Sequence, residues 1–498
     1  MANISIIGSG FSGISAAAYL AAKGHSVDVF EKNASAGGRA RQFRTEEGYL
    51  FDMGPSWYWM PGVFEDFFND FGYKVSELYE LELLDPGFEM VFENNQLKIP
   101  ADYKSLREVF EALEPGSAKK LDKFMEQARF KYETGMNKMA RMPGLSLMEF
   151  ADPSLFRAAL GLDLFSSFSA HVRKFFKHPA LIALMEFPVL FLGAMPREMP
   201  ALYSLMNYAG LKLGTWYPKG GFGKVIESMM RMAVENGARF HFNAEVQRIN
   251  IENRKVQGLV VNGETIQADA VVASADYHHV ESSLLPPAFR NYDEAYWSKK
   301  TFAPSCLIYY LGINKKIPGL HHHTLFFDED LDRHSIEIYK DPQWPTKPLF
   351  YVCCTSKSDE HAAPAGHENI FLLMPIAPGL QDTEETRERY YEVMMRRLGS
   401  FAGMNDLKDH VTYKKSYCVS DFVFDYHSYR GNAYGLANTL RQTAVLKPRM
   451  QNKKIANLFY AGQLTVPGPG VPPCIISGKI AARQLEKYLK KQPNETII

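Results

Sequence analysis

Residues 4–43 read ISIIGSGFSGISAAAYLAAKGHSVDVFEKNASAGGRARQF, and this stretch predicts how the chain begins to fold. Its first four residues form an apolar run that is short enough for a buried strand and too short for a helix. Glycines in the spacing G-x-G-x-x-G follow, then an Ala-rich segment, and then a second apolar run at 27–30 that ends on Glu31. Strand, glycine turn, helix, strand and acid in this order are typical of the βαβ unit that binds a dinucleotide.

The residues of this unit suit the tasks that a dinucleotide imposes. Gly8 permits the tight turn out of the strand, and Gly13 lets the helix pack closely on the strands. Gly10 allows the backbone to approach a pyrophosphate at a helix N-terminus, where free N–H groups favour anions. Glu31 is placed to accept hydrogen bonds from a ribose hydroxyl. The predicted cofactor-binding residues of this unit are Gly8, Ser9, Gly10, Ser12, Gly13, Glu31 and Lys32.

The residues after this unit indicate which dinucleotide is bound. Gly37, Gly38 and Arg39 bring the backbone close to a phosphate a second time, with a cation beside it, and FDMGP follows at 51–55. Here the chain resembles the flavoprotein superfamily that includes amine oxidases, protoporphyrinogen oxidases and carotenoid desaturases, in which this continuation marks FAD rather than NAD. The resemblance implies FAD as the cofactor and adds to its site Gly38, Arg39, Gly54 and Pro55.

Length and composition limit the remaining possibilities. The chain has 498 residues, enough for two domains or one domain with a large insertion, and its 46% apolar and 22% charged residues are typical of a folded globular protein. The formal net charge is zero, which argues against nucleic acid as a partner. The five cysteines are scattered and indicate reduced thiols. Since the first strand leaves no room for a signal peptide, we expect a cytoplasmic protein.

An aromatic stretch at 56–75 has two interpretations. From residue 63 to residue 71 its apolar side chains follow helical spacing, which favours a helix packed on the core. The alternative concerns Trp57, Tyr58, Trp59 and Met60, which would line a substrate channel or contact a membrane.

The middle of the chain is predicted to be mainly helical. Residues 86–100 indicate a hairpin around two asparagines, and residues 105–141 have a helical pattern. Residues 145–215 are also helical but unusually apolar, although the run at 180–195 is shorter than the ~20 residues that a membrane span needs. Two interpretations of this segment remain. It forms either an interfacial helix with cations on its polar face or a buried helical subdomain. The cations would be Arg173, Lys174 and Lys177.

The next segment returns to an α/β pattern. A glycine turn, an amphipathic helix and a strand ending near Ile251 are followed by a pair of strands at 255–262 and 264–275. Residues 300–425 are rich in strands, with one helix of about fifteen residues from residue 384, and predict a mixed sheet that forms the floor of a second domain.

The histidines of these segments do not predict a metal site. His321, His322 and His323 are consecutive, and consecutive residues cannot easily converge on one ion. We therefore expect a surface loop there, and we interpret His278 and His279 in the same way.

Residues 457–483 indicate a second approach to the cofactor. An apolar strand at 458–461 stops at a glycine, and a Gly/Pro loop leads into a helix that begins near Pro473. A helix N-terminus here would supply N–H donors and stabilise negative charge on a reduced flavin. This segment adds to the site Gly462, Gly470 and Val471. The resemblance to the superfamily further implies that Val246 lies beside the adenine and that Ala275 ends a strand near the cofactor, both through backbone contacts.

Three longer motifs narrow the resemblance to the bacterial-type phytoene desaturases, which use FAD alone. They are MPREMPALYSLMNYAGLKLGTWYPKGGFGKV at 195–225, VVASAD at 271–276 and TVPGPGVP at 465–472. Many members carry His at the position of Val466, so a role for that His cannot be transferred.

The resemblance implies carotenoid biosynthesis, in which a hydride and a proton leave adjacent allylic carbons of phytoene to give products of the neurosporene or lycopene type. Oxygen or a quinone would accept the electrons. Alternatives are a desaturase or oxygenase of a later carotenoid, such as a hydroxycarotenoid 3,4-desaturase, or of a triterpenoid. An amine oxidase-like flavoprotein and a non-catalytic lipid-binding flavoprotein belong to other classes. No catalytic residue is assigned, but Glu149 and Glu186 are possible proton acceptors.

These inferences together predict an α/β fold with three parts. A Rossmann-like FAD-binding domain would comprise 1–75, 215–290 and 430–498, and a mixed-sheet substrate domain 76–105 and 291–429. The remaining residues, 106–214, would form a helical, membrane-facing subdomain. A long isoprenoid hydrocarbon is costly to dissolve in water, at about 0.8 kcal/mol per CH₂. The enzyme is therefore expected to associate peripherally with the inner face of the cell membrane.

Overall fold

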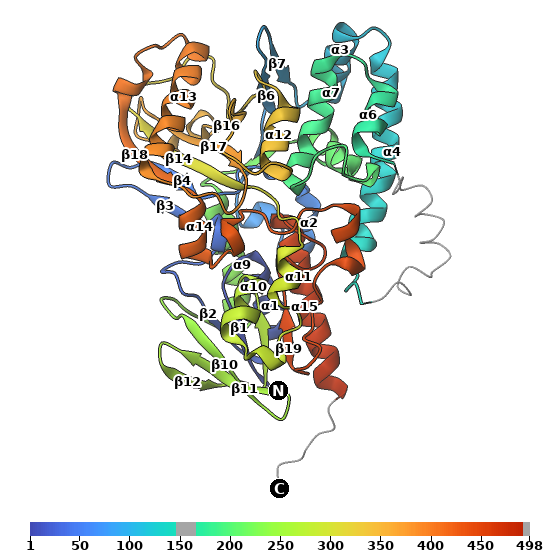
Figure 1. Cartoon of the computed structure of the whole chain (residues 1–498), viewed down its shortest axis with the longest axis vertical. Coiled ribbons are helices and arrows are strands. Elements are labelled where there is room, and N and C mark those ends of the chain that lie inside the picture. The colour runs from blue at the N-terminus through green and yellow to red at the C-terminus, as the bar shows by residue number, and fades with distance from the viewer. Residues whose placement is uncertain (146–165, 492–498) are drawn as a thin grey trace.

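A computed structural model describes residues 1–145 and 166–491 and has a mixed α/β fold (Figure 1). A five-stranded sheet lies at the end of the molecule that carries both termini, and a seven-stranded sheet lies at the other end. A group of helices stands beside the seven-stranded sheet. The predicted combination of a dinucleotide-type sheet with a second, mixed sheet is confirmed.

The five-stranded sheet is parallel throughout and has the order β19-β13-β1-β2-β9. Its central strands are buried on both faces, because helices pack on one face while the strands at 246–261 and the residues at 277–285 pack on the other. Their bounds agree with the predicted βαβ unit within one or two residues. The strands are β1 (Asn3–Ile7), β2 (Ser26–Phe30), β9 (Ala238–His241), β13 (Ala270–Ala273) and β19 (Leu458–Tyr460).

Small residues let the helices of this sheet pack at short distance. Helix α1 (Phe11–Ala21) contacts both α9 (Phe222–Glu235) and α15 (Val471–Lys491). A Cβ at Gly478 of α15 would lie 2.3 Å from the carbonyl oxygen of Ser12, so only glycine allows this approach of the two helices. The first and last parts of the chain are therefore held together at the N-terminal end of α1.

The segment after α9 differs in detail from the prediction. It forms two strands rather than one, because β9 joins the parallel sheet and β10 (Val246–Glu252) begins a separate antiparallel sheet. That sheet continues with β11 (Lys255–Val261) and β12 (Glu264–Gln267). The predicted strand at 264–275 was wrong as a single strand, since the chain leaves this sheet at residues 268–269 and re-enters the parallel sheet as β13.

The seven-stranded sheet has the order β18-β14-β17-β16-β15-β6-β7. All neighbours are antiparallel except β15 and β6, so the predicted mixed sheet is confirmed. Helix α13 (Glu384–Ala402) is longer than expected, because Thr383 caps its first turn and Gly403 ends it with a positive φ. The strands are β6 (Phe88–Val91), β7 (Gln96–Ile99), β14 (Ser305–Ile313), β15 (His323–Phe326), β16 (Phe350–Cys353), β17 (Glu368–Ile376) and β18 (Val411–Tyr417).

The expected surface loop at the three histidines was wrong for two of them. His323 begins β15, which lies inside the sheet between β16 and β6, and its side chain has no exposed area. His322 is 4% exposed. Sequence reasoning missed this because a run of imidazoles does not have the apolar pattern of a buried strand.

Two short antiparallel pairs and helix α2 connect the sheets. The pairs are β3 (Gln42–Arg44) with β4 (Leu50–Asp52), and β5 (Leu81–Leu83) with β8 (Trp216–Pro218). Helix α2 (Pro61–Asn69) buries Val63, Phe64, Phe67 and Phe68, so the helix predicted from the aromatic stretch is confirmed as part of the core.

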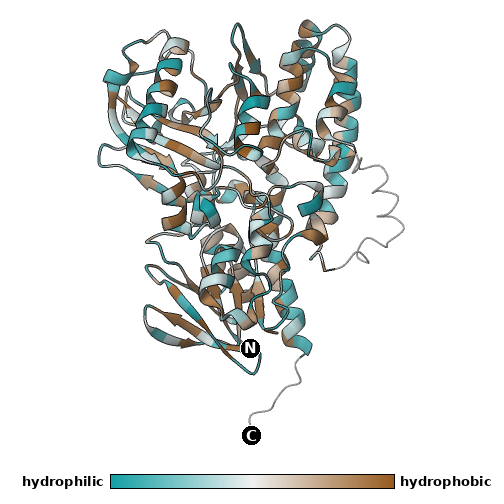
Figure 2. Ribbon diagram, in the orientation of Figure 1, coloured by the Kyte–Doolittle hydropathy of each residue, from teal (hydrophilic) through white to brown (hydrophobic). Residues whose placement is uncertain are grey.

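The helical group comprises α3 (Tyr103–Leu113), α4 (Ser117–Asn137), α6 (Phe168–Phe175) and α7 (Pro179–Glu186). Figure 2 shows hydrophobic ribbon along the seven-stranded sheet and mixed colouring on α3 and α4. The apolar side chains of α6 and α7 point into the core, which favours a buried helical region for this described part. Residues 146–165 lie outside the described residues. Within the described residues, no helix has the length and apolar character to cross a bilayer.

Candidate active site

One continuous cavity of about 460 Å³ runs from the β1–α1 turn to the seven-stranded sheet. Fourteen of the sixteen predicted cofactor residues line it, although they come from six separate segments of the chain. They are Gly8, Gly10, Ser12, Glu31, Lys32, Gly38, Arg39, Gly54, Pro55, Val246, Ala275, Gly462, Gly470 and Val471. The two that do not line it are Ser9 and Gly13.

The glycine turn leaves room for a ligand at the N-terminus of α1. Gly10 is the N-cap residue and no side chain caps the first turn, so the first N–H groups of the helix are available. A Cβ at Gly10 would meet nothing within 4 Å, whereas a Cβ at Gly38 would lie 3.3 Å from the Cα of Gly10. The two glycines therefore form an open cradle of backbone that fits a pyrophosphate.

Gly13 and Ser9 act within the protein instead. A Cβ at Gly13 would lie 2.0 Å from the carbonyl oxygen of Gly8, so this glycine allows the close packing that the motif predicts. Ser9 donates from both its N–H and its hydroxyl to Glu31, each at 2.9 Å. Ser12 Oγ lies 2.7 Å from Ser274 Oγ, which ties α1 to the end of β13.

Glu31 is buried and is held on both carboxylate oxygens. Oε2 accepts from Ser9, and Oε1 accepts from the N–H and the side-chain amide of Asn33, each at 2.9 Å. This network fixes the carboxylate at the edge of the cavity beside the end of β2. The position is the one that an acid contacting a ribose requires.

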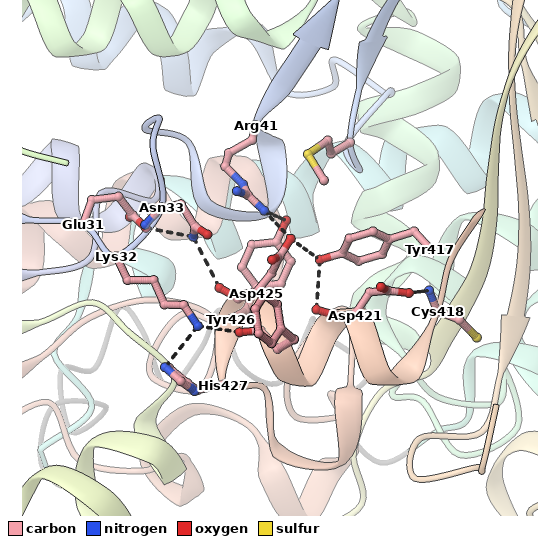
Figure 3. Close-up of polar contacts among 12 residues, drawn as sticks. Glu31, Lys32, Asn33, Arg41, Tyr417, Cys418, Asp421, Asp425, Tyr426 and His427 are labelled. Atoms are coloured by element: carbon pink, nitrogen blue, oxygen red, sulfur yellow. Dashed lines mark hydrogen bonds and ion pairs between the residues drawn. The ribbon is translucent and has the colours of Figure 1, made fainter. Parts of the chain in front are cut away.

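Helix α14 (Val419–Tyr426) also lines the cavity, and sequence reasoning missed it. Figure 3 shows its C-terminal residues beside Lys32 and Arg41. Lys32 Nζ donates to the carbonyl of Phe424 and lies 3.4 Å from His427 Nε2. Arg41 forms an ion pair with Asp425, whose carboxylate also accepts from Tyr417 at 2.9 Å. No local pattern could reveal the contacts of Lys32 and Arg41, because their partners are nearly 400 positions away in the chain.

Arg39 is oriented by the segment that follows α14. Its Nη2 donates to Ser428 Oγ at 3.0 Å and to the carbonyl of Asn432 at 3.3 Å, and its guanidinium lies 5.0 Å from the centre of the Tyr426 ring. Its buried Nε has no hydrogen-bond partner within the described residues. A guanidinium in this position, with its Nε–H still available as a donor, fits the phosphate contact that the sequence predicts.

Two further cavity residues were not predicted, and the surface loop expected at His278 and His279 was wrong, because both are half-buried residues of a short helix at 277–279. Asp276 caps α10 (Tyr277–His279) through one carboxylate oxygen, while its buried Oδ2 has no partner in the described part of the chain. Burial raises the pKa of Asp276. His279 stacks on His427 with ring centres 3.9 Å apart, and burial lowers its pKa to about 3, so it lines the cavity as a neutral ring. The VVASAD motif pointed to this corner, but not to these side chains.

The Gly/Pro loop brings the N-terminus of α15 to the cavity, as predicted. Gly462, Gly470 and Val471 all line it. The helix begins at Val471 rather than near Pro473, and the prolines at 472 and 473 carry no N–H. The start of α15 therefore offers fewer N–H donors than expected, namely those of the residues that precede the two prolines.

The other end of the cavity is apolar. Of the four residues in the alternative interpretation, Trp57, Trp59 and Met60 line the cavity, whereas Tyr58 is buried in the core against Phe64. Other lining side chains come from residues 187–206, from helix α12 (Leu331–Tyr339) and from the strands of the seven-stranded sheet and the residue after β15. They include Phe187, Leu190, Leu192, Met206, Leu325, Phe327, Ile338, Phe350, Tyr351 and Leu373.

Candidate proton acceptors are scarce at this apolar end. Glu186 is buried in an ion pair with Arg173 and does not line the cavity, and Glu149 lies outside the described residues. His334 does line it, but its Nδ1 accepts from the N–H of Leu349 and its Nε2 donates to the carbonyl of Pro375. Burial lowers the pKa of His334 to about 4, so it is neutral. The carboxylates among the described lining residues all lie at the dinucleotide end.

Comparison with known proteins agrees with this geometry. Residues 11–485 match the family of flavin-containing amine oxidoreductases. The chain is 40% identical to a carotenoid 3,4-desaturase from Haloarcula japonica, over 97% of this chain and 98% of that protein. It is 28% identical to a zeta-carotene-forming phytoene desaturase from Myxococcus xanthus, over 98% and 95%.

Among solved structures, cyclohexylamine oxidase from Brevibacterium oxydans has the same fold, with a TM-score of 0.58 at 15% identity and coverage of 98% of this chain and 100% of that one. The open glycine cradle, the buried acid and the unpaired donor of Arg39 fit a dinucleotide, and the family match identifies this dinucleotide as FAD. This chain belongs to the flavin-containing amine oxidoreductase family and is an FAD-dependent oxidoreductase.

Proposed function

We propose that this enzyme desaturates the isoprenoid chain of a carotenoid, by removing a hydride from one carbon and a proton from the neighbouring carbon. The observation that carries the proposal is the cavity, which joins a dinucleotide end to a long apolar end within one continuous space. FAD, when bound, would supply the hydride acceptor. Both curated relatives reported above carry names of carotenoid desaturases.

The chain's own residues would act mainly by positioning the hydrocarbon and excluding water. A hydrocarbon offers no polar group to bind, so rate enhancement depends on holding the reacting carbons in a productive orientation. Trp57, Phe187 and Tyr351 form rigid walls, and Met60 and Met206 supply adaptable ones, as an irregular apolar ligand requires. An amine substrate would need a polar enclosure for its ammonium group, which the described walls of this end do not form.

Two substrates suit the apolar end of this cavity, and each is supported by a different relative. Phytoene is the substrate that the longer motifs imply, and the phytoene desaturase relative supports it. A later carotenoid, desaturated at the 3,4 position, is favoured by the higher identity of 40% to the Haloarcula japonica enzyme.

The cofactor domain in this proposal comprises residues 1–75, 215–290 and 430–498, and the substrate domain comprises 76–105 and 291–429. Their support is that every strand of the parallel sheet falls in the first set of ranges and every strand of the mixed sheet in the second. FAD would contact the sixteen predicted residues either directly or, for Ser9 and Gly13, through the groups that they support.

Peripheral contact of residues 106–214 with the inner face of the cell membrane completes the proposal. Its support is physical, since a carotenoid would enter from a bilayer more readily than from water. Phe130 and Leu145 are more than 40% exposed, and Lys174 and Lys177 are exposed cations of the same region that could face anionic lipid. Oxygen or a membrane quinone would then be the electron acceptor. The test is flotation with liposomes, where F130S/L145S would reduce binding and binding unchanged by this variant would contradict the assignment.

The activity itself is tested in carotenoid-free bacteria that are engineered to accumulate one substrate each. One host would supply phytoene and another a hydroxylated, already conjugated carotenoid. Extracts are compared by chromatography with absorbance detection, because each new conjugated double bond shifts absorption to longer wavelength. Product in the second host alone would establish the later carotenoid as substrate. Flavin-loaded protein with unchanged pigment in every host would contradict the proposed function.

A further inference from the structure

A buried group of soft metal ligands lies behind the apolar wall of the cavity. Contrary to the expectation for consecutive histidines, one ring nitrogen each of His322 and His323 and the sulfur of Cys353 all lie within 4.8 Å of one another. The three residues are between 0% and 4% exposed. Two of them are direct cross-strand neighbours, since His323 of β15 pairs with Cys353 of β16.

Each imidazole is held at one nitrogen and free at the other. His322 Nδ1 lies 2.9 Å from Ser358 Oγ, and His323 Nδ1 lies 2.6 Å from the hydroxyl of Tyr351. Neither Nε2 has a hydrogen-bond partner within the described residues, although both are fully buried. A histidine that binds a metal commonly has this arrangement, in which a hydrogen bond at one nitrogen orients the ring and the other nitrogen binds the ion.

Packing restricts how these rings can move. The ring of His323 stacks on Trp57, with centres 4.1 Å apart and planes 9° apart, and the two imidazole centres are 4.4 Å apart. A metal with bonds of about 2.0 Å to nitrogen and 2.3 Å to sulfur places its ligand atoms roughly 3.5 Å from one another. The three ligand atoms would therefore have to approach one another by at most about 1.3 Å, which small side-chain rotations can supply.

We infer that His322, His323 and Cys353 form a binding site for a soft cation, Cu(I). Thiolate and imidazole donors favour Cu(I) and Zn(II) over Mg²⁺ or Ca²⁺. Structural Zn(II) sites take four protein ligands, and the described residues supply three here. One thiolate and two neutral imidazoles leave a monovalent ion with no net charge, whereas a divalent ion would bury an uncompensated charge.

Binding releases one proton for each ion, because the thiol must become a thiolate. Burial raises the pKa of Cys353 to about 12, so the sulfur carries its proton before the metal arrives. The proton leaves as the copper–sulfur bond forms, and no oxidant or reductant is consumed. The cavity offers a route to the site, since Trp57 and Tyr351 line it and contact His323 from that side.

Neighbouring residues provide matched controls. Cys354 is equally buried, but successive side chains on a strand point to opposite faces, and its sulfur contacts Ser356 Oγ and Glu368 rather than the histidines. His321 is partly exposed and does not belong to the group.

The experiment uses flavin-loaded, full-length protein under anaerobic conditions, with Cu(I) delivered from a colorimetric chelator that competes for the ion. The wild type is expected to take up one Cu(I) per chain, and C354S and H321Q to retain that stoichiometry with affinity within about threefold. C353S and H323Q should lose at least about 100-fold in affinity. H322Q provides a third variant should one of these two fail to load flavin.

X-ray absorption at the copper edge should show one sulfur and two nitrogen neighbours. Failure of the wild type to compete for Cu(I), equal uptake by C353S and C354S, or tight Zn(II) binding without Cu(I) binding would each overturn the assignment. If the two free nitrogens instead bind a bridging water, the wild type will fail to compete for Cu(I). None of these readouts depends on catalytic turnover or on the identity of the substrate.

Discussion

The two ends of the cavity are built in different ways. At the dinucleotide end the walls are mostly backbone and small residues, and three of them, Gly8, Gly10 and Glu31, lie within 24 positions of one another. At the apolar end the walls are large side chains from distant segments, such as Phe187 and Tyr351. Ligand binding at the dinucleotide end depends on which backbone positions leave room for a Cβ. Ligand binding at the apolar end depends on the volume and polarity of the side chains that line it. Substitutions at the two ends should therefore fail in different ways.

The largest effect is expected from G13A. The added Cβ would lie 2.0 Å from the carbonyl oxygen of Gly8, which is backbone and cannot move aside easily. We expect the free energy of unfolding to fall by about 2–4 kcal/mol and flavin to be lost on purification. Thermal unfolding measures the loss of stability, and the flavin absorbance of the purified protein measures the loss of flavin. Normal stability with full flavin content would show that this packing contact is not required.

G10A separates cofactor binding from stability at the same turn. Gly10 has an ordinary φ of −72°, and its Cβ would meet no protein atom within 4 Å. The apoprotein should keep its stability or gain up to about 1 kcal/mol, because alanine restricts the unfolded chain. Affinity for FAD should fall by about 100-fold, since the methyl group would occupy the cradle. Titration of apoprotein with FAD tests this, and equal losses of affinity and stability would contradict the open cradle.

L190D tests the apolar end. Leu190 lines the cavity, and a carboxylate there would have to be desolvated when a hydrocarbon binds. Desaturation should fall at least about tenfold while flavin content stays at the wild-type level. L190M is the matched control, because it keeps volume and apolar character and should lose little activity. Loss of flavin from L190D would show that the two ends are not independent.

The smallest effect on flavin content and activity is expected at a buried lysine beside the Gly/Pro loop, because Lys447 does not line the cavity. Lys447 Nζ would lie 3.3 Å from a Cβ at Gly468 and has no hydrogen-bond partner within the described residues. Burial lowers its pKa from 10.5 to about 7. Between these values the unfolded chain binds a proton that the folded protein does not, so wild-type stability rises with pH by up to about 1.4 kcal/mol per pH unit.

K447M removes this dependence. The variant should be more stable than the wild type at pH 7, and its advantage should shrink as the pH rises towards 9.5. Chemical denaturation of both proteins at several pH values measures the difference, and subtraction removes the other titrating groups that they share. A constant difference across this range would show that Lys447 is paired or accessible to water.

Parts of this protein could be predicted from sequence where the pattern that indicates them lies within a short segment of the chain. The β1–α1–β2 unit repeats known spacings within 30 residues, and the structure places its strands and helix within two residues of the prediction. The mixed sheet was also predicted, because runs of apolar residues indicate buried strands wherever they occur. The break at residues 268–269 was missed, since the alternation of apolar residues at 266, 268, 270 and 272 continues across it and only the partner strands differ.

The sequence by itself determined the dinucleotide site, because the conformations that glycine permits and the position of one acid after a strand are local properties of the chain. Only the tertiary structure decided the rest. It placed α14 beside Lys32 and Arg41, it assembled the apolar end from distant side chains, and it buried His322 and His323 beside Cys353. The physical reason is that packing brings together residues that share no local pattern, so their proximity exists only once the chain has folded.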